Sequence, residues 1–258
     1  MKKLHLVVLS DFGYVNGGNA AVALASARGL ARRGHAVTLL SAVGATTPSD
    51  DPDGVRLVST DQQEILTDSN RMRAILQGTW NVKAARMLRA LLRDLDPACT
   101  VVHLHSWTQA LSSSVVRAAL AVGVRVVYTM HDYFSLCPNG TFFNHQQNEI
   151  CRLRPMSLSC IASHCDKRSY SHKLWRILRQ AVQAHRGGIP NRILDFIAVS
   201  PFSHAILAPG LPAGARVYYV PSPIEVSRDV PARVAENRAF VMVGKITQGK
   251  GAIVFAKA

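Results

Sequence analysis

Short apolar runs alternate with longer amphipathic stretches along most of this chain, and this alternation constrains the fold more than any other feature. The apolar runs, each with the length of a buried strand, cover residues 4–9, 35–40, 55–58, 100–104, 124–129, 196–199 and 216–220. Strands of a parallel sheet are almost continuously apolar because helices cover both faces. The alternation therefore predicts an α/β fold with a doubly wound parallel sheet.

The stretches between these runs have helical spacing. Helices are predicted over residues 19–33, from 69 or 70 to 93, and over 109–121 and 171–185. The first of them has Asn19 in the N-cap position and Gly34 just beyond its last turn. The last carries Leu174 and Leu178 on an apolar face, which we expect to lie against the sheet.

The composition changes at Pro221-Ser222-Pro223, after the last of the seven runs. We expect a first domain over residues 1–224, a polar linker over 225–238 and the start of a second domain over 239–258. That last segment holds one predicted strand, 239–243, and the beginning of one helix, which is too little to bury a core. The sequence therefore predicts that most of a second domain is missing, either because the chain is a fragment or by natural truncation.

The chain is strongly basic, with a net charge of +14. Such charge suits an anionic membrane, a phosphate-bearing ligand or nucleic acid, although arginine-rich codon usage would give the same balance. Because no nucleic-acid-binding motif accompanies the charge, we expect no nucleic-acid partner. No run reaches the roughly 18 apolar residues of a membrane span, and the first run lacks a signal cleavage site. We expect a cytoplasmic protein that associates peripherally with the anionic inner face of the membrane through the basic segment 173–186.

Polar residues stand at the carboxyl ends of two predicted strands. His131 and Asp132 follow one of them, and His103 and His105 close another. Ligands of open α/β sheets bind beyond these ends. An imidazole can shuttle a proton there, and an adjacent carboxylate can orient hydroxyl groups. His131 and Asp132 are therefore our candidate catalytic residues, whereas a core or capping role is the alternative for the other two histidines.

Two glycine-containing segments are candidates for phosphate binding. Gly17-Gly18 lies between the first strand and its helix, where the backbone can approach an anion closely. The dinucleotide fingerprint is not met there, and a tight turn is the alternative. Lys245 and Lys250 follow the 239–243 strand, and two ammonium groups suit a diphosphate. Ordinary surface lysines are the alternative in that case.

Four cysteines lie in one long segment after His131, namely Cys137, Cys151, Cys160 and Cys165. Four thiolates can close a tetrahedral zinc site, although no C-x-x-C pair is present. Free buried thiols are one alternative, and disulfides are another that a reducing cytosol disfavours. The four residues are therefore candidate ligands of a structural zinc ion.

The chain contains seven short motifs, which follow one another in a fixed order. They are Gly17-Gly18, Arg33-Gly34-His35-Ala36-Val37, Val101-Val102-His103-Leu104-His105, Thr129-x-His131, Val199-Ser200-x-Phe202, Tyr219-Val220-Pro221 and Val243-Gly244-Lys245-x-x-x-x-Lys250-Gly251. In this order and spacing they resemble the GT-B glycosyltransferases that use activated sugars with retention of configuration. The His131–Gly140 segment with its cysteines resembles a narrower subgroup linked to polysaccharide or cell-surface glycan assembly.

The resemblance implies two facing Rossmann-like domains, of which this chain holds the acceptor-side domain and only the start of the donor-binding one. It implies transfer of a sugar from a nucleotide-sugar donor to a glycan or lipid-linked acceptor, with no cofactor required for catalysis. Gly17 and Gly18 would approach the donor diphosphate, and Lys245 and Lys250 would neutralise it. His131 would face the transferring sugar or the acceptor.

His105, Tyr133 and Asn139 would line the acceptor side in the same scheme. The paired glutamates with which the family engages the donor would lie beyond the last residue. The resemblance therefore implies a glycosyltransferase by ancestry that is a poor catalyst alone. A membrane-surface or partner-binding module without catalytic activity is the alternative.

Overall fold

The computed structural model describes residues 2–44, 49–223, 233, 236, 240–242, 246 and 251–257. The chain divides into two compact units, Met1–Pro223 and Ile224–Ala258. The first unit contains the sheet and the candidate site, and the second contains α8 (Ala252–Lys257). The bounds given above for the linker and for a second domain stay predictions.

An eight-stranded sheet forms the centre of the first unit, in the order β10-β9-β6-β5-β1-β2-β4-β3. Its strands are β1 (His5–Phe12), β2 (Ala36–Val43), β3 (Ser49–Asp50), β4 (Val55–Ser59), β5 (Thr100–Leu104), β6 (Arg125–Met130), β9 (Asp195–Ala198) and β10 (Arg216–Tyr219). All neighbouring strands are parallel except β3, which pairs antiparallel with β4. Each predicted apolar run coincides with one strand, which confirms the predicted Rossmann-like parallel sheet.

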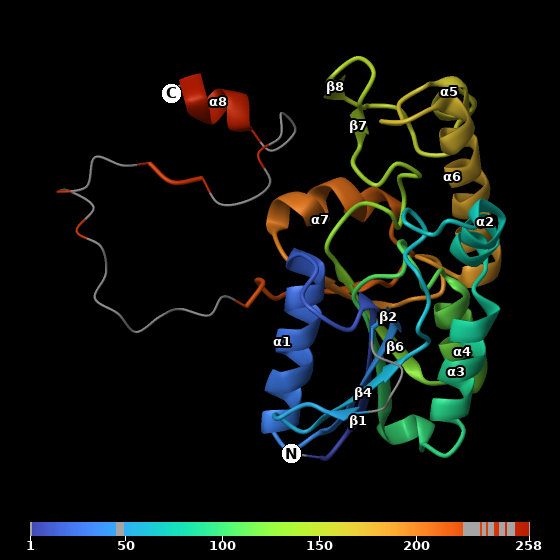
Figure 1. Cartoon of the computed structure of the whole chain (residues 1–258), viewed down its shortest axis with the longest axis vertical. Helices are drawn as coiled ribbons and strands as arrows, with labels where there is room; N and C mark the ends of the chain where they lie inside the picture. Colours follow the sequence, from blue (N-terminus) through green and yellow to red (C-terminus); the bar gives the residue numbers. More distant parts are fainter. Residues whose placement is uncertain are drawn as a thin grey trace. The chain divides into compact units, whose positions relative to one another are not determined.

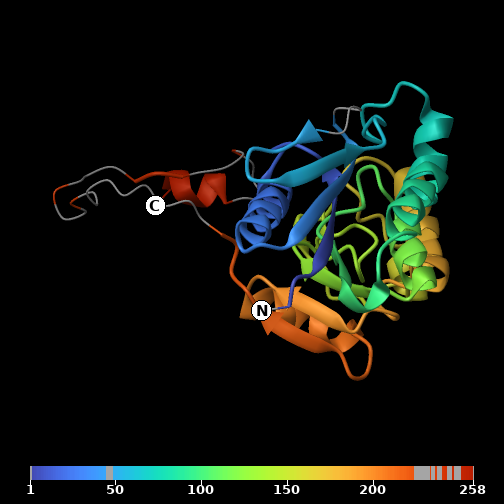
Figure 2. The ribbon, with the colours of Figure 1, turned by 90° about the horizontal axis from the view of Figure 1, so that it is seen from below.

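Helices cover both faces of this sheet (Figure 1). α1 (Gly18–Arg32) lies on one face, and α3 (Val82–Leu92) and α4 (Ser114–Val122) lie on the other (Figure 2). In β1, Val8 belongs to the apolar cluster that includes α1, and Val7 belongs to the one that includes α3 and α4. Because successive side chains of a strand point to opposite faces, the strand register decides which residues reach α1.

The helix predicted to end at residue 93 is divided into two. α2 (Arg71–Thr79) ends before Asn81, and α3 begins after it. The side chain of Asn81 accepts a hydrogen bond from Ala84 N and donates one to Ala110 O. A side chain that binds the backbone in this way competes with helix propagation. The prediction of one continuous helix was wrong at this position.

α6 (Tyr170–Val182) buries polar side chains instead of apolar ones. Lys173 and Gln180 are buried, whereas Leu174 and Leu178 are 44% and 56% exposed. The prediction that the apolar face packs against the sheet was therefore wrong. The physical reason is that α6 packs on polar loop backbone, where Gln180 Nε2 donates to Ser135 O at 3.1 Å.

Short elements complete the described residues. They are the hairpin strands β7 (Phe143–Asn144) and β8 (Glu149–Ile150), the helices α5 (Leu158–Ala162) and α7 (Pro201–Leu207), the 3-10 turns Pro97–Cys99 and Ala208–Gly210, and the π turn Gln183–Gly187. Residues 240–242, the described part of the strand predicted over 239–243, are not in a strand. Lys245 and Lys250 lie outside the described residues. In the part of the chain that the structure describes, every helix is too short or too polar to cross a membrane.

Candidate functional site

Three histidines meet at the carboxyl ends of β5 and β6. His103 and His105 alternate with buried Leu104, and His131 follows the last residue of β6. Nδ1 of His105 lies 3.0 Å from Nε2 of His131, and Nε2 of His103 lies 2.8 Å from Oγ1 of Thr129. The ring centroids of His103 and His105 are 4.1 Å apart. The structure thus brings together the three histidines that the sequence singled out.

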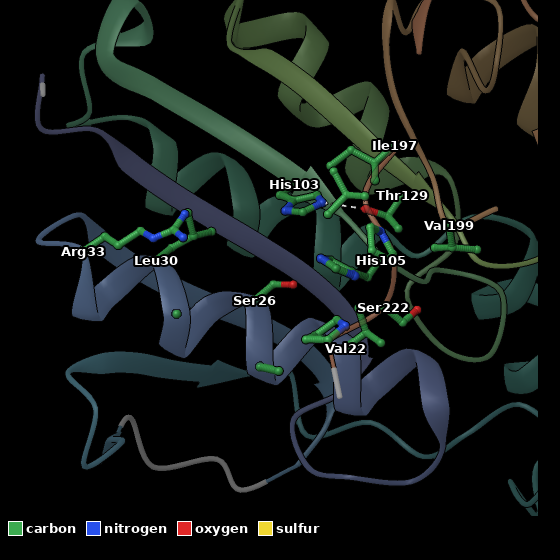
Figure 3. A pocket seen from close by; sticks show the side chains of 15 residues that line it. Val22, Ser26, Leu30, Arg33, His103, His105, Thr129, Ile197, Val199 and Ser222 are labelled. Atoms are coloured by element: carbon green, nitrogen blue, oxygen red, sulfur yellow. Dashed lines mark hydrogen bonds between the residues drawn. The ribbon is translucent and has the colours of Figure 1, made fainter. Parts of the chain in front are cut away.

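A pocket of about 320 Å³ lies between α1 and this edge of the sheet. Ser26 and Leu30 of α1 line one side, His103 and His105 line the sheet side, and residues 220–223 contribute a further wall (Figure 3). This volume is at the lower end of the range for small-molecule sites. His103 and His105 therefore border a space that a small ligand can occupy.

The imidazoles of this site are neutral near pH 7. Burial lowers the pKa of His103 and His131 to about 4, with repulsion from His131 contributing at His103. Burial also lowers the pKa of His105 well below its ordinary value. Among the described residues, Nδ1 of His131 has no hydrogen-bond partner. A neutral imidazole with a free ring nitrogen can bind a substrate hydroxyl or accept its proton.

We expect these histidines to make the fold sensitive to acid. Between pH 6.5 and pH 4 the unfolded chain binds protons that His103 and His131 do not take up in the folded state. The free energy of unfolding therefore falls as the pH falls, by up to about 3 kcal/mol for each histidine. His103→Asn should show a weaker pH dependence than wild type in urea unfolding across this window. Equal slopes for the two proteins would contradict the prediction.

Asp132, next to His131, has a perturbed carboxyl group. Burial raises the pKa of Asp132 to about 6, and the charge of Asp11 adds to the shift while Phe134 N–H and Arg179 oppose it. Its Oδ1 accepts the hydrogen bond from Phe134 N at 3.0 Å. Because this pKa is raised, the folded state binds a proton at Asp132 more readily than the unfolded chain does. Asp132 therefore increases the free energy of unfolding as the pH falls below 6, and it offsets part of the decrease caused by the histidines. A carboxyl group with such a pKa can serve as a general acid or base near neutrality.

Two charged residues that were not predicted as site residues support this site. Asp11, at the end of β1, is fully buried and accepts hydrogen bonds from the backbone N–H groups of residues 109–111 at 2.9 to 3.1 Å. Arg179 of α6 donates to Thr108 O at 2.9 Å. Burial lowers the pKa of Arg179 to about 10, against the opposing charges of Asp11 and Asp132. For Asp11, the only signal of this role in the sequence was its place after the apolar run 4–9.

The segment that follows His131 and Asp132 in the chain contributes no residue to the lining of the pocket. The ring of Tyr133 is half-buried and packs edge-on against Phe142, with centroids 5.5 Å apart. Asn139 is buried; its Nδ2 donates to Cys165 O at 2.8 Å, and its Oδ1 accepts from Arg176 Nη1 at 2.6 Å. These contacts hold Asn139 against Cys165 and α6. Contact of Tyr133 or Asn139 with an acceptor stays a prediction.

The first turn of α1 is open to ligands. Gly17 is its N-cap residue, no side chain of the described residues caps the helix, and the turn contains no acidic residue. A Cβ atom added to Gly17 or Gly18 would meet nothing within 4 Å, so both border free space. Free N–H groups at the start of a helix attract anions. These surroundings would allow Gly17 and Gly18 to contact a phosphate group, and this contact stays a prediction.

The predicted four-cysteine zinc site is not formed. Cys137, Cys160 and Cys165 are buried, Cys151 is half-buried elsewhere in the segment, and all four are free thiols. Nζ of Lys173 lies 2.8 Å from Sγ of Cys165, and an ammonium group repels a metal cation. In the described ranges, no three His, Cys, Asp or Glu side chains are arranged to hold a metal ion. The described geometry does not support the zinc prediction, and the four residues are free thiols in this structure.

Comparison with known proteins assigns the chain to a family. The model of Glycosyltransferase Family 4 matches residues 16–228. Among solved structures, LpCGTa in complex with UDP is 14% identical, with a TM-score of 0.47, over 87% of this chain and 55% of that chain. A UDP-glucosyltransferase from Polygonum tinctorium, capable of glucosylating indoxyl and solved with 3,4-dichloroaniline, is 15% identical, with a TM-score of 0.44, over 87% and 54%.

The chain thus spans about half the length of these solved structures. No curated protein matches the sequence. The family match covers well over half of the chain and confirms the resemblance seen in its motifs. The protein belongs to Glycosyltransferase Family 4.

Proposed function

We propose that this protein acts in the transfer of a sugar from a nucleotide-sugar donor to a glycan or lipid-linked acceptor, with retention of configuration, in polysaccharide or cell-surface glycan biosynthesis. Membership of Glycosyltransferase Family 4 supports the class of reaction. The observation that carries the proposal is the hydrogen-bonded pair of His105 and His131, with Asp132 next to it, at the carboxyl edge of the sheet. Ligands of such sheets bind at this edge.

Each candidate residue has a proposed role that follows from its chemistry. His131 binds the transferring sugar or the acceptor hydroxyl through its free Nδ1, and Asp132 supplies a carboxyl group that titrates near pH 6. Gly17 and Gly18 offer helix N–H groups to the donor diphosphate. Lys245 and Lys250 neutralise the leaving diphosphate, which is an electrostatic role that needs no metal.

Deletion of the gene tests this function directly. We expect the deletion to remove one glycosyl residue from a surface glycan or its lipid-linked precursor, and the intact gene to restore it. The anomeric configuration of that residue, measured by NMR, should equal that of the donor. An unchanged glycan, together with no transfer from any common nucleotide sugar, would overturn the proposal. If the glycosyl residue that is lost has the anomeric configuration opposite to that of the donor, only the proposal of retention would be overturned.

The exposed surface of α2 and α6 supports a second, compatible role in peripheral membrane binding at the cytoplasmic face. Met72 and Leu76 of α2 are 67% and 66% exposed, and Leu174 and Leu178 of α6 are 44% and 56% exposed. Side chains of this kind enter the lipid headgroup region when a basic protein approaches an anionic bilayer. Arg176 and Arg179, by contrast, face the protein interior.

We expect the double variant Leu174→Asp, Leu178→Asp to lose most of its co-sedimentation with vesicles containing phosphatidylserine. The physical reason is that both changes replace apolar contact area with charges of the same sign as the lipid. Val15→Asp, at another exposed apolar position, is the matched control. If both proteins bind equally, membrane contact does not involve α6.

A further inference from the structure

A buried lysine stands among the thiols of the cysteine segment. Lys173 is fully buried, and Cys137, Cys160 and Cys165 near it are each less than a tenth exposed. Nζ of Lys173 lies 2.8 Å from Sγ of Cys165 and 3.9 Å from Sγ of Cys160. We call these four residues the lysine–thiol cluster.

The partner of the buried ammonium group in this cluster is a sulfur atom and not the usual carboxylate. Lysine is almost never fully buried without a partner, yet no carboxylate of the described residues pairs with Lys173. The nearby buried carboxylate of Asp166 is bound to Arg176 and His172 instead. Burial disfavours the charge of Lys173, but the hydrogen bond to Cys165 and the neighbouring sulfur charges outweigh it and raise the pKa of Lys173. The chief partner of Lys173 is thus Cys165.

We propose that Cys165 and Lys173 form a reversible N–O–S cross-link when the protein meets a peroxide. The sulfur of Cys165 is the nucleophile that attacks the peroxide. The 2.8 Å between Nζ and Sγ accommodates one bridging oxygen atom with little movement, whereas a direct S–N bond would require a much closer approach. Burial also keeps competing thiols in solution away from the oxidised sulfur.

The cross-link consumes two molecules of hydrogen peroxide. In the first step the sulfur of Cys165 attacks one peroxide oxygen, the O–O bond breaks, and a sulfenic acid and one water form. Lys173 then gives its ammonium proton to a water molecule of the solvent and becomes a neutral amine. In the second step the amine and the sulfenic acid each lose one hydrogen as the N–O bond forms. These leave as two protons and two electrons, which the second peroxide takes up as its O–O bond breaks and it becomes two waters.

The bond would fasten α6 to the segment that follows Asp132 and contains Asn139. The backbone oxygen of Cys165 accepts a hydrogen bond from Asn139 Nδ2, and Arg176, three residues after Lys173, donates to Asn139 Oδ1. A covalent link between Cys165 and Lys173 therefore closes a ring of contacts that holds Asn139 in place. The cluster lies outside the groups assigned to sugar transfer, so the link can be tested whether or not the proposed transfer is correct.

The test treats the full chain with hydrogen peroxide, digests it with trypsin and identifies the peptides by mass spectrometry. We expect linked peptides containing Cys165 and Lys173 that are heavier by one oxygen and lighter by two hydrogens. Cleavage after Lys173 should be lost, and dithiothreitol added to the unfolded protein before digestion should restore it. Cys151→Ser, which changes a thiol outside the cluster, should form the link as wild type does.

Two variants separate the cross-link from other oxidation. Cys165→Ser keeps the size of the side chain, Lys173→Arg keeps the charge, and each should abolish the link while circular dichroism confirms the fold. A disulfide between Cys160 and Cys165, recognised by the loss of two hydrogens without added oxygen, would overturn the proposal. Cys165 found only as a sulfinic acid, or unmodified, would overturn it as well.

Discussion

Replacing Asp11 with alanine should lower the free energy of unfolding by about 3–5 kcal/mol. The carboxylate of Asp11 is fully buried and accepts hydrogen bonds from three consecutive backbone N–H groups, those of residues 109–111. Without the carboxylate these donors stay in the interior with no partner, and each such donor costs about 1–3 kcal/mol. Urea unfolding of the purified chain, followed by circular dichroism, measures the change.

Asp53→Ala is the matched control for this prediction. Asp53 lies near the surface and pairs with Arg28 and Arg32 at 3.7 and 3.1 Å. Surface ion pairs of this kind contribute up to about 1 kcal/mol. Asp11→Asn should give an intermediate loss, because its amide nitrogen would face at least one of the N–H groups. If Asp11→Ala costs no more than Asp53→Ala, the three backbone contacts do not stabilise the fold as argued.

The sheet could be predicted from the sequence because its strands are buried on both faces. Such strands must be apolar at almost every position, so each one stands out as a run between polar stretches. The alternation of His103 and His105 around Leu104 likewise predicted that both side chains would lie on one face. The structure places both on the α1 side, where they line the pocket.

The supports of the site could not be predicted in the same way. Asp11 meets residues 109–111 across almost a hundred positions of the chain, and no local pattern links two such segments. The periodicity of α6 showed an apolar face but not its direction. The helix turns Lys173, Arg176 and Arg179 inward because buried sulfur and carboxylate groups lie beneath it.

Asn81 shows a third reason why the sequence was insufficient. The apolar spacing is helical on both sides of Asn81, so periodicity alone favours one helix. The break depends on the bond between Asn81 Nδ2 and Ala110 O at 2.8 Å, which exists only after the chain has folded. Tertiary contact thus overrides local propensity at this position.

His131→Ala should lower the rate of sugar transfer by about 10²–10⁴-fold, the usual contribution of a positioned general acid or base. Burial keeps the pKa of His131 at about 4, so the imidazole is neutral under physiological conditions and its free Nδ1 can bind a hydroxyl group. The rate is measured with labelled nucleotide sugar in membranes of the deletion strain that carries the variant gene. Protein amounts are equalised by immunoblot.

The controls distinguish loss of the imidazole from loss of the fold. His185→Ala removes an exposed imidazole from the π turn and should leave the rate unchanged. Free imidazole added to His131→Ala should restore part of the rate, because the vacated space lies beside His105, whose Nδ1 loses its partner. A variant that retains more than about a tenth of the wild-type rate would fall outside the range for such a group. His131 would then only position its neighbours, and Asp132, with a pKa of about 6, would become the group that exchanges the proton.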